Sequence, residues 1–269
     1  MHSHSHLDVL DRINTAIEEA KLVFAKYSSG VIAAEYKAAH DPVTKADKEL
    51  DAVLRKTLLR EGEGWLSEER TDDLSRLGYE RVWIVDPLDG TREFIAGIPE
   101  FCFSIAYVEG GKPIAGGICN PATNEVFVGS LQTGVTYNGR AVHASQRQEL
   151  SGALVLASRS ETSRGEWEQF QKAPFKVQAV GSVAYKLARV AAGLADATFT
   201  LSPKHEWDIA GGAALVLSAG GHIQLLDGSE LICNCRQPIV SGLIACGPLL
   251  KDELTKLLAS HVAITRAQA

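Results

Sequence analysis

One segment constrains the fold of this chain more than any other, the run Val82-Trp83-Ile84-Val85-Asp86-Pro87-Leu88-Asp89-Gly90-Thr91. Its apolar half predicts a strand that is buried on both faces, and we expect the chain to turn at Pro87, which lacks an amide hydrogen for the ladder. Gly90 permits a tight turn, and residues 91–96 predict a short helix that Thr91 opens. Two carboxylates, Asp86 and Asp89, are therefore expected at the carboxyl end of a buried strand, beside free helix amides.

Two carboxylates at such a place repel each other and are costly to desolvate unless a cation neutralises them. An oxygen-rich site suits a hard divalent ion such as Mg²⁺, while the amides of a helix N-terminus attract an anion. A metal beside an anion cradle indicates phosphate. The structural alternative is that Asp86 ends the strand and Asp89-Gly90 makes a turn.

The run Asp-Pro-Leu-Asp-Gly-Thr after an apolar strand resembles the signature of the inositol monophosphatase superfamily of metal-dependent phosphatases. Its continuation, Arg92-Glu93-Phe94, is similar to the 3'(2'),5'-bisphosphate nucleotidase branch, whose members hydrolyse 3'-phosphoadenosine 5'-phosphate. The competing interpretation is a haloacid-dehalogenase phosphatase, in which an aspartate nucleophile stands two positions before the Asp of Asp-Gly-Thr. Asp86 and Asp89 are three positions apart, and this spacing favours the first family.

Two helices are predicted before this segment. Apolar residues from Leu10 to Phe24 recur at steps of three and four, which indicates an amphipathic helix. A second helix is expected after Thr44 as N-cap, with Asp47 as the acidic member of a capping-box pair. The resemblance gives Asp47 a further role, as the residue that hydrogen-bonds Thr91, and both roles can hold. Lys37, just upstream, is a lesser candidate to steer phosphate.

Other acidic residues resemble the remaining metal-binding elements of the superfamily. Glu68 and Glu69 follow a short predicted strand, and neighbours on a strand point to opposite faces, so only one can face the Asp86 site. The resemblance makes Glu68 that residue. Asp208 at a helix start is ordinarily a cap, but Trp207-Asp208 before a helix of small residues and Gly-Gly resembles the third metal-binding element. The resemblance implies two or three Mg²⁺ ions held by Glu68, Asp86, the Leu88 carbonyl, Asp89 and Asp208.

The secondary-structure pattern changes near residue 145. Residues 101–138 predict a meander of antiparallel strands with glycine turns, so residues 1–144 are expected to form an α+β domain that carries most metal ligands. Strands then alternate with helices, which predicts an α/β domain over residues 145–269 that supplies Asp208 and substrate contacts. Within it, a helix is expected at residues 166–172 and a strand at residues 239–246. The resemblance implies the layered αβαβα sandwich of the inositol monophosphatase and fructose-1,6-bisphosphatase type.

The composition limits the partners. The formal net charge is −6 and no basic stripe is present, which argues against a nucleic-acid partner. No apolar run approaches the ~20 residues of a membrane helix, and the alternating histidines at the start, expected to be a solvated tail, lack the apolar core of a secretory signal. The five cysteines mostly lie in apolar context, which suits thiols in a reducing cytoplasm. A small phosphorylated metabolite is the expected partner, and dimers are common in the superfamily.

The resemblance implies direct hydrolysis of a phosphomonoester by water, without a covalent enzyme intermediate, and inhibition by Li⁺. Thr91, oriented by Asp47, would position or deprotonate the water. The amides of Gly90 and Thr91 would hold the phosphate oxygens. The catalytic residues are thus expected to be Asp47, Glu68 and Thr91.

Substrate contacts are expected mainly from the second half of the chain. Ser158-Arg159-Ser160 and Gly181-Ser182 match the nucleotidase branch, although Glu161 stands where those enzymes often have His. Lys204, His205 and Glu206, beside Asp208, are candidates for substrate selection, although a solvated loop is an equal alternative. The predicted substrate-binding residues are Asp89, Gly90, Thr91, Ser158, Gly181, Ser182, Lys204 and Glu206.

The substrate itself is less well determined. Tyr185 occupies the position where nucleotidases tend to have a lysine for the second phosphate, with Lys186 one place later. Inositol monophosphatases tend to have a ring-binding Glu where this chain has Leu201. The predicted substrate is 3'-phosphoadenosine 5'-phosphate, with inositol 1-phosphate as the alternative. A non-catalytic, metal-dependent binding protein is a third and more distant hypothesis.

Overall fold

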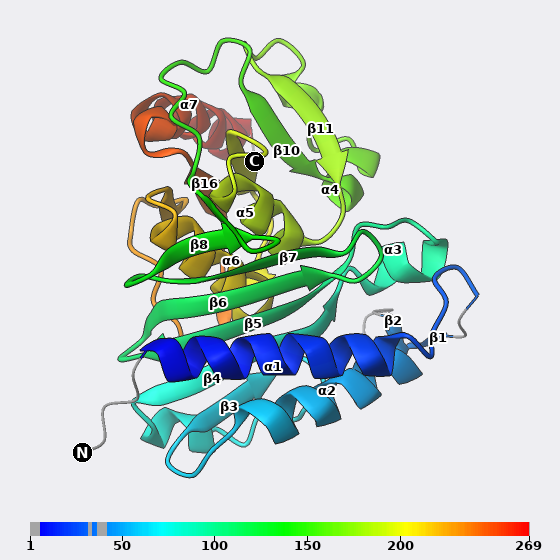
Figure 1. The fold of residues 1–269 in the computed structure, drawn as a ribbon. Helices are drawn as coiled ribbons and strands as arrows, with labels where there is room; N and C mark the ends of the chain where they lie inside the picture. The colour runs from blue at the N-terminus through cyan, green and yellow to red at the C-terminus, as the bar shows by residue number, and fades with distance from the viewer. Residues whose placement is uncertain (1–5, 32–33, 37–41, 269) are drawn as a thin grey trace.

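Helices and sheets alternate in layers, in the order αβαβα (Figure 1). The computed structural model describes residues 6–31, 34–36 and 42–268. The predicted roles of Lys37 and of the N-terminal histidine run fall on residues outside these ranges. The layered sandwich expected from the family resemblance is confirmed.

The larger sheet is built from the first half of the chain. Its strands, in spatial order, are β3 (Gly64–Ser67), β4 (Arg81–Asp89), β5 (Cys102–Glu109), β6 (Lys112–Asn120), β7 (Glu125–Ser130), β8 (Gly134–Tyr137) and β9 (Arg140–Val142). β3 and β4 run parallel, and every later neighbour is antiparallel. The predicted meander is therefore confirmed, and β9 extends it beyond the Asn138-Gly139 turn.

Helices α1 (His6–Phe24) and α2 (Lys45–Leu58) cover one face of this sheet, as Figure 1 shows. Their apolar stripes meet the sheet in one buried cluster, which includes Ile13 and Leu50 from the helices and Trp83 from β4. A short hairpin, β1 (Ala34–Tyr36) and β2 (Pro42–Thr44), precedes α2. The capping box predicted at Thr44 is present, so the start of α2 is defined locally.

The smaller sheet comes from the second half of the chain. Its spatial order is β11 (Lys176–Val180), β10 (Leu154–Ser158), β12 (Ala197–Thr200), β16 (Leu243–Cys246) and β14 (His222–Leu225). The first three strands are parallel, as expected for an α/β unit, and the other two pair antiparallel. A separate two-stranded pair joins β13 (Lys204–His205) to β15 (Ile239–Val240).

Helices α5 (Val183–Ala191) and α6 (Glu206–Ser218) lie between the two sheets (Figure 1). Small residues let α6 approach the larger sheet closely, since a Cβ built on Gly116 of β6 would be 2.5 Å from the Gly211 carbonyl oxygen. Helix α7 (Lys251–Gln268) packs through Leu254 on the outer face of the smaller sheet. Because α6 belongs to the second half but packs on the sheet of the first, the division at residue 144 remains a prediction.

Two predicted elements of the second half differ from the structure. Residues 166–172 form only a 3₁₀ turn, η3 (Glu168–Phe170). A helix that the sequence pattern did not predict, α4 (Arg159–Ser163), forms just before it, because the side chain of Ser158 caps its start. The strand expected at residues 239–246 is broken into β15 and β16, because Gly242 takes a positive φ of 140°. Three further short elements are η2 (Ser75–Gly78), α3 (Thr91–Ala96) and η4 (Pro248–Leu250). Among the described residues, every helix is too short or too polar to cross a lipid bilayer.

Candidate active site

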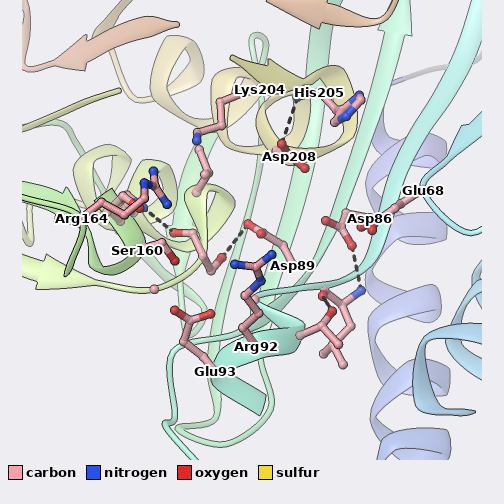
Figure 2. Close-up of a pocket in the computed structure, with 18 residues that line it drawn as sticks. Glu68, Asp86, Asp89, Arg92, Glu93, Ser160, Arg164, Lys204, His205 and Asp208 are labelled. Carbon is pink, nitrogen blue, oxygen red and sulfur yellow. Dashed lines mark hydrogen bonds between the residues drawn. The ribbon is translucent and has the colours of Figure 1, made fainter. Parts of the chain in front are cut away.

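The two aspartates of the central motif lie where the pairing of β4 with β5 changes register. Asp86 pairs with Ser104 and Asp89 with Cys102, and the ladder is irregular between them. Pairing therefore resumes beyond Pro87 instead of ending there, because a proline inside a bulge needs no partner for its missing amide hydrogen. Asp86 is 2% exposed, and both aspartates line one pocket (Figure 2).

Asp89 is held by the second half of the chain. Its Oδ2 accepts hydrogen bonds from the Ser182 hydroxyl and the Ala184 amide, both at 2.7 Å. Ser182 also caps α5, because its side chain accepts from the Tyr185 amide. The start of α5 thus fixes one oxygen of Asp89, and the amides of a helix N-terminus favour a negative charge at that position.

Asp208 reaches the same pocket from the first turn of α6. Its Oδ2 accepts from the His205 amide at 3.0 Å, so Asp208 is the N3 residue of a capping box in which His205 is the N-cap. Asp208 also belongs to a carboxylate cluster, since Asp86, Asp89 and Asp208 each place one carboxylate oxygen within 4.8 Å of the others. The fold therefore brings Asp208 to Asp86 and Asp89, which precede it by more than a hundred positions in the chain.

Glu68 lines the pocket from the end of β3 (Figure 2). Its amide donates to the Val85 carbonyl at 3.3 Å, which extends the parallel pairing of β3 with β4. Its charge contributes to raising the pKa of both Asp86 and Asp208. Glu69 is not among the described residues that line the pocket, but the expected alternation along a strand does not apply, because β3 ends at Ser67 and both glutamates lie in the turn after it.

The electrostatics of this cluster favour a cation. Burial, and then repulsion by the neighbouring carboxylates, raises the pKa of Asp86 and of Asp208 well above the usual aspartate value. Burial also raises the pKa of Asp89, although the hydrogen bonds from Ser182 and Ala184 oppose that shift. A divalent cation would remove the repulsion, and carboxylate oxygens are the ligands that Mg²⁺ takes. The donor set therefore fits Mg²⁺.

Asp47 and Thr91 form a pair beside these carboxylates. The Thr91 hydroxyl lies 3.1 Å from Asp47 Oδ1 and 3.0 Å from the Leu88 carbonyl oxygen, and it can donate to either. The other oxygen of Asp47, Oδ2, accepts from the Thr44 amide at 2.8 Å and from its hydroxyl at 2.6 Å. Asp47 thus has both contacts that were expected of it, one through each oxygen.

The turn between β4 and α3 requires glycine at position 90. Gly90 has a φ of 96°, and a Cβ there would be 2.9 Å from the Glu100 carbonyl oxygen. Gly90 is the N-cap of α3, so Thr91 is the first helical residue and not the cap. Because its hydroxyl is not used to cap the helix, that hydroxyl is free to contact Asp47.

The pocket that these residues share has a volume of about 260 Å³. Four predicted substrate contacts from the second half line it, namely Ser158, Gly181, Ser182 and Lys204. Side chains that the sequence analysis had not placed in the substrate site line it as well (Figure 2). These are Arg92, Glu93, Ser160, Arg164 and Lys186.

Lys204 is positioned by a buried carboxylate. Its Nζ lies 3.3 Å from Oε1 of Glu161, which is 1% exposed. Glu161 also accepts from the Thr200 hydroxyl and, at 3.2 Å, from the Trp167 indole. Burial by itself raises the pKa of Glu161, but the hydrogen bond from Thr200 and the charge of Lys204 outweigh it and lower that pKa. The negatively charged Glu161 carboxylate therefore positions the Lys204 ammonium group.

The expected substrate role of Glu206 needs correction. Its side chain is 1% exposed and lies outside the described pocket lining. Its two oxygens accept from the amides of Asn234, at 2.6 Å, and Cys235, at 2.9 Å. As the first residue of α6, Glu206 projects toward the 233–235 loop, so it anchors that loop instead of contacting the pocket.

Lys186 is the clearest residue that the sequence analysis misjudged. Tyr185, at the position compared with the nucleotidases, turns away and donates its hydroxyl to Glu125. Lys186 lines the pocket, and its Nζ donates to the carbonyls of Val180, at 3.4 Å, and Ser182, at 3.1 Å. The sequence could have predicted this position, because Lys186 follows the capping residue Ser182 by four residues and so lies on the same face of the helix.

Comparisons with known proteins agree with this geometry. Residues 7–265 match the Inositol monophosphatase family. A relative from Solanum lycopersicum, inositol monophosphatase 3, is 34% identical over 237 residues, which cover 83% of this chain and 86% of the relative.

Solved structures show the same fold. An inositol monophosphatase from Thermotoga maritima has a TM-score of 0.79 and 28% identity, covering 94% of this chain and 98% of its own. CysQ from Bacteroides thetaiotaomicron has a TM-score of 0.76 and covers 89% of this chain and 97% of its own. Its identity of 24% shows a shared fold alone.

Proposed function

The chain belongs to the inositol monophosphatase family and is a magnesium-dependent phosphatase, and from this premise we propose that it hydrolyses a small polyol monophosphate such as inositol 1-phosphate. One observation carries the proposal above all. The oxygens of Asp86, Asp89 and Asp208 lie within 4.8 Å of one another, and the Asp47–Thr91 pair lies beside them.

The metal site is proposed to hold two or three Mg²⁺ ions. Asp86, Asp89 and Asp208 would be its core ligands, with the Glu68 carboxylate and the Leu88 carbonyl at its edge. Mg²⁺ bound there would supply Lewis-acid assistance to the phosphoryl group and activation of a water nucleophile. The buried, mutually repelling carboxylates would provide the negative charge to hold it.

The proton of the attacking water is proposed to pass to the Asp47–Thr91 pair. With its hydrogen directed to Asp47 Oδ1, the Thr91 hydroxyl presents a lone pair to the pocket and can accept a hydrogen bond from water. Burial raises the pKa of Asp47, although the hydrogen bonds from Thr44 and Thr91 oppose the shift. A carboxyl group with a raised pKa is better suited to take up a proton near neutral pH.

Backbone amides at the start of α3 are proposed to hold the phosphate. The amides of Gly90 and Thr91 directly follow Asp89, the proposed metal ligand, and both residues line the pocket. Donors aimed at the phosphate oxygens stabilise the charge that develops as the ester bond breaks. The leaving alcohol would then lie toward the second half of the chain, where Ser158 and Lys204 line the pocket.

The bisphosphate expected from the sequence, 3'-phosphoadenosine 5'-phosphate, is the second candidate. It is favoured by the cations that the second half brings to the pocket, Arg164, Lys186 and Lys204, because a second phosphate needs local positive charge. Two of these cations already form ion pairs within the protein: Arg164 lies 2.6 Å from Glu166, and Lys204 lies 3.3 Å from Glu161. The names of the curated relatives favour the inositol phosphate.

A phosphate-release assay on inositol 1-phosphate, 3'-phosphoadenosine 5'-phosphate and fructose 1,6-bisphosphate tests the proposal, with Mg²⁺, with a chelator, and with Li⁺ added. We expect Mg²⁺-dependent release, fastest from inositol 1-phosphate, and its loss in Asp89→Asn. The control is Asp11→Asn, which changes an exposed aspartate on α1. Faster release from the bisphosphate would replace the first candidate with the second. No release from any substrate, with Mg²⁺ still raising the melting temperature, would favour the non-catalytic binding protein.

A further inference from the structure

We propose that Glu93 accepts a hydrogen bond from a hydroxyl group of the substrate, next to the phosphate ester, and so selects polyol phosphates. The inference rests on the proposed function, because it concerns the same pocket and names the group that the pocket recognises beyond the phosphate. Glu93 is the third residue of α3 and lines the pocket with 8% of its surface exposed.

Among the described residues, no residue other than Glu93 itself donates a hydrogen bond to the Glu93 carboxylate. The donor within Glu93 is its backbone amide. A carboxylate offers about four acceptor sites, and leaving such a group buried without donors is costly. A donor supplied by the ligand would satisfy it.

The position of the side chain is defined by Gly181. A Cβ on Gly181 would be 2.5 Å from Glu93 Cγ and 2.8 Å from its Oε1, so only glycine leaves room for this side chain. The Gly181 amide in turn donates to Glu100 at 2.7 Å, and Glu100 is held by the Arg159 guanidinium at 2.7–3.0 Å. These hydrogen bonds fix the Gly181 backbone, against which the Glu93 side chain packs.

Glu93 lies away from the metal cluster. Figure 2 shows its carboxylate at the opposite end of the pocket from Asp208, on the side where Ser160 lies. The other acidic residues of the described lining, Glu68, Asp86, Asp89 and Asp208, all belong to the proposed metal site. Glu93 is therefore the acidic residue in this lining that remains to contact the alcohol part of a substrate.

The chemistry of the group indicates a hydroxyl donor. An anionic substituent at this position would be repelled by Glu93, and an apolar one would leave the carboxylate unsatisfied. Leu201 offers no alternative acceptor, because its side chain is a hydrocarbon, and it packs against the buried cluster that includes Phe199 and Ile244. A ring or chain that carries hydroxyls beside its phosphate satisfies the site.

The test compares two substrates of the same ring size, inositol 1-phosphate and cyclohexyl phosphate, which lacks ring hydroxyls. We measure kcat and KM with Mg²⁺ for the wild type, Glu93→Gln, Glu93→Leu and the exposed control Glu61→Gln. The wild type and the control should prefer inositol 1-phosphate. We expect the preference in kcat/KM to fall roughly tenfold in Glu93→Gln and up to roughly a hundredfold in Glu93→Leu, mostly through KM.

The outcomes separate this inference from the proposed function. Equal losses for both substrates in the Glu93 variants would show a structural role and overturn the inference. A wild type that hydrolyses cyclohexyl phosphate as well as inositol 1-phosphate would also overturn it, even if a variant failed to fold. Absence of Mg²⁺-dependent release from both substrates, and from p-nitrophenyl phosphate, would instead reject the proposed function.

Discussion

The hydroxyl of Thr91 lies 3.1 Å from Oδ1 of Asp47, although the two residues are 44 positions apart. The same carboxylate caps α2 through Oδ2, which accepts from the amide and hydroxyl of Thr44. One side chain therefore links the start of a helix on one side of the larger sheet to the pocket at the end of β4. Oδ1 contacts Thr91 and Oδ2 contacts Thr44, so mutations can separate the contact with the pocket from the contact with the helix start.

Asp47→Asn should lower kcat by about 10²–10⁴-fold, the usual contribution of a general base. An amide has one acceptor oxygen, so Asn cannot accept from both Thr44 and Thr91. We expect a small loss of stability, about 1 kcal/mol, as for a weakened N-cap. Steady-state kinetics with saturating Mg²⁺ and thermal unfolding measure the two effects.

Thr44→Ala is the matched control for this prediction. It removes the hydroxyl that contacts Asp47 Oδ2 and leaves Oδ1 in contact with Thr91. Its stability should fall by about 1 kcal/mol, while kcat falls far less than in Asp47→Asn. Equal losses of kcat in the two variants would contradict separate tasks for the two oxygens.

Asp208→Asn should reduce the loss of stability that rising pH causes when metal is chelated. The pKa of Asp208 in the folded protein is raised by burial and then by Asp89 and Glu68. The stability that such a group contributes is complete below its unfolded pKa, near 3.9, and is lost as pH rises through the folded pKa. As the pH rises above about 4, chelated Asp208→Asn should therefore become progressively more stable relative to the wild type.

Adding Mg²⁺ should make the wild type more stable than Asp208→Asn. A ligand at 100 times its Kd stabilises the folded state by about 2.7 kcal/mol, and Asp208→Asn should lose most of this gain. Denaturant unfolding at several pH values, with chelator and with Mg²⁺, measures both effects. A variant that gained as much from Mg²⁺ as the wild type would show that Asp208 is not a ligand.

Gly116→Ala should weaken both the fold and the metal site. Its Cβ would lie 2.5 Å from the Gly211 carbonyl oxygen and 3.1 Å from Ala214 Cβ, so α6 must shift away from β6. Such overpacking costs about 1–3 kcal/mol. Since α6 carries Asp208, we also expect weaker Mg²⁺ binding, measured by calorimetry. Gly78→Ala, where a Cβ meets nothing within 4 Å, is the control and should change neither property.

Lys204→Met tests the second candidate substrate. The change keeps the length of the side chain but removes its charge, so a second phosphate on the substrate would lose a charged partner. If the bisphosphate is the true substrate, its kcat/KM should fall roughly 10- to 100-fold, and that for inositol 1-phosphate should fall less. Glu161→Gln is the partner variant, because it breaks the same ion pair but keeps the cation in the pocket. Equal effects on both substrates would exclude a second-phosphate role for Lys204.

Much of the fold was predictable because its signals are local. The stripe from Leu10 to Phe24, the Thr44 capping box and the Gly110-Gly111 hairpin turn each depend on neighbours in sequence, and each element forms where it was expected. The helix predicted at residues 166–172 is wrong: only the turn η3 forms there, and its N-cap residue, Trp167, provides no side-chain hydrogen bond. The Ser158 cap began α4 earlier in the chain.

The sequence by itself determined the chemical character of the site, because the spacing of Asp86, Asp89 and Thr91 sets two carboxylates and a hydroxyl on one strand–helix turn. Only the tertiary structure decided which other residues join them. It turned Glu206 toward a loop and Lys186 into the pocket. It also left the Glu93 carboxylate in the pocket without a partner from another residue in the described chain. The physical reason is that these positions depend on how α3, α5 and α6 pack between the two sheets, and packing contacts join residues whose separation in sequence carries no periodic signal.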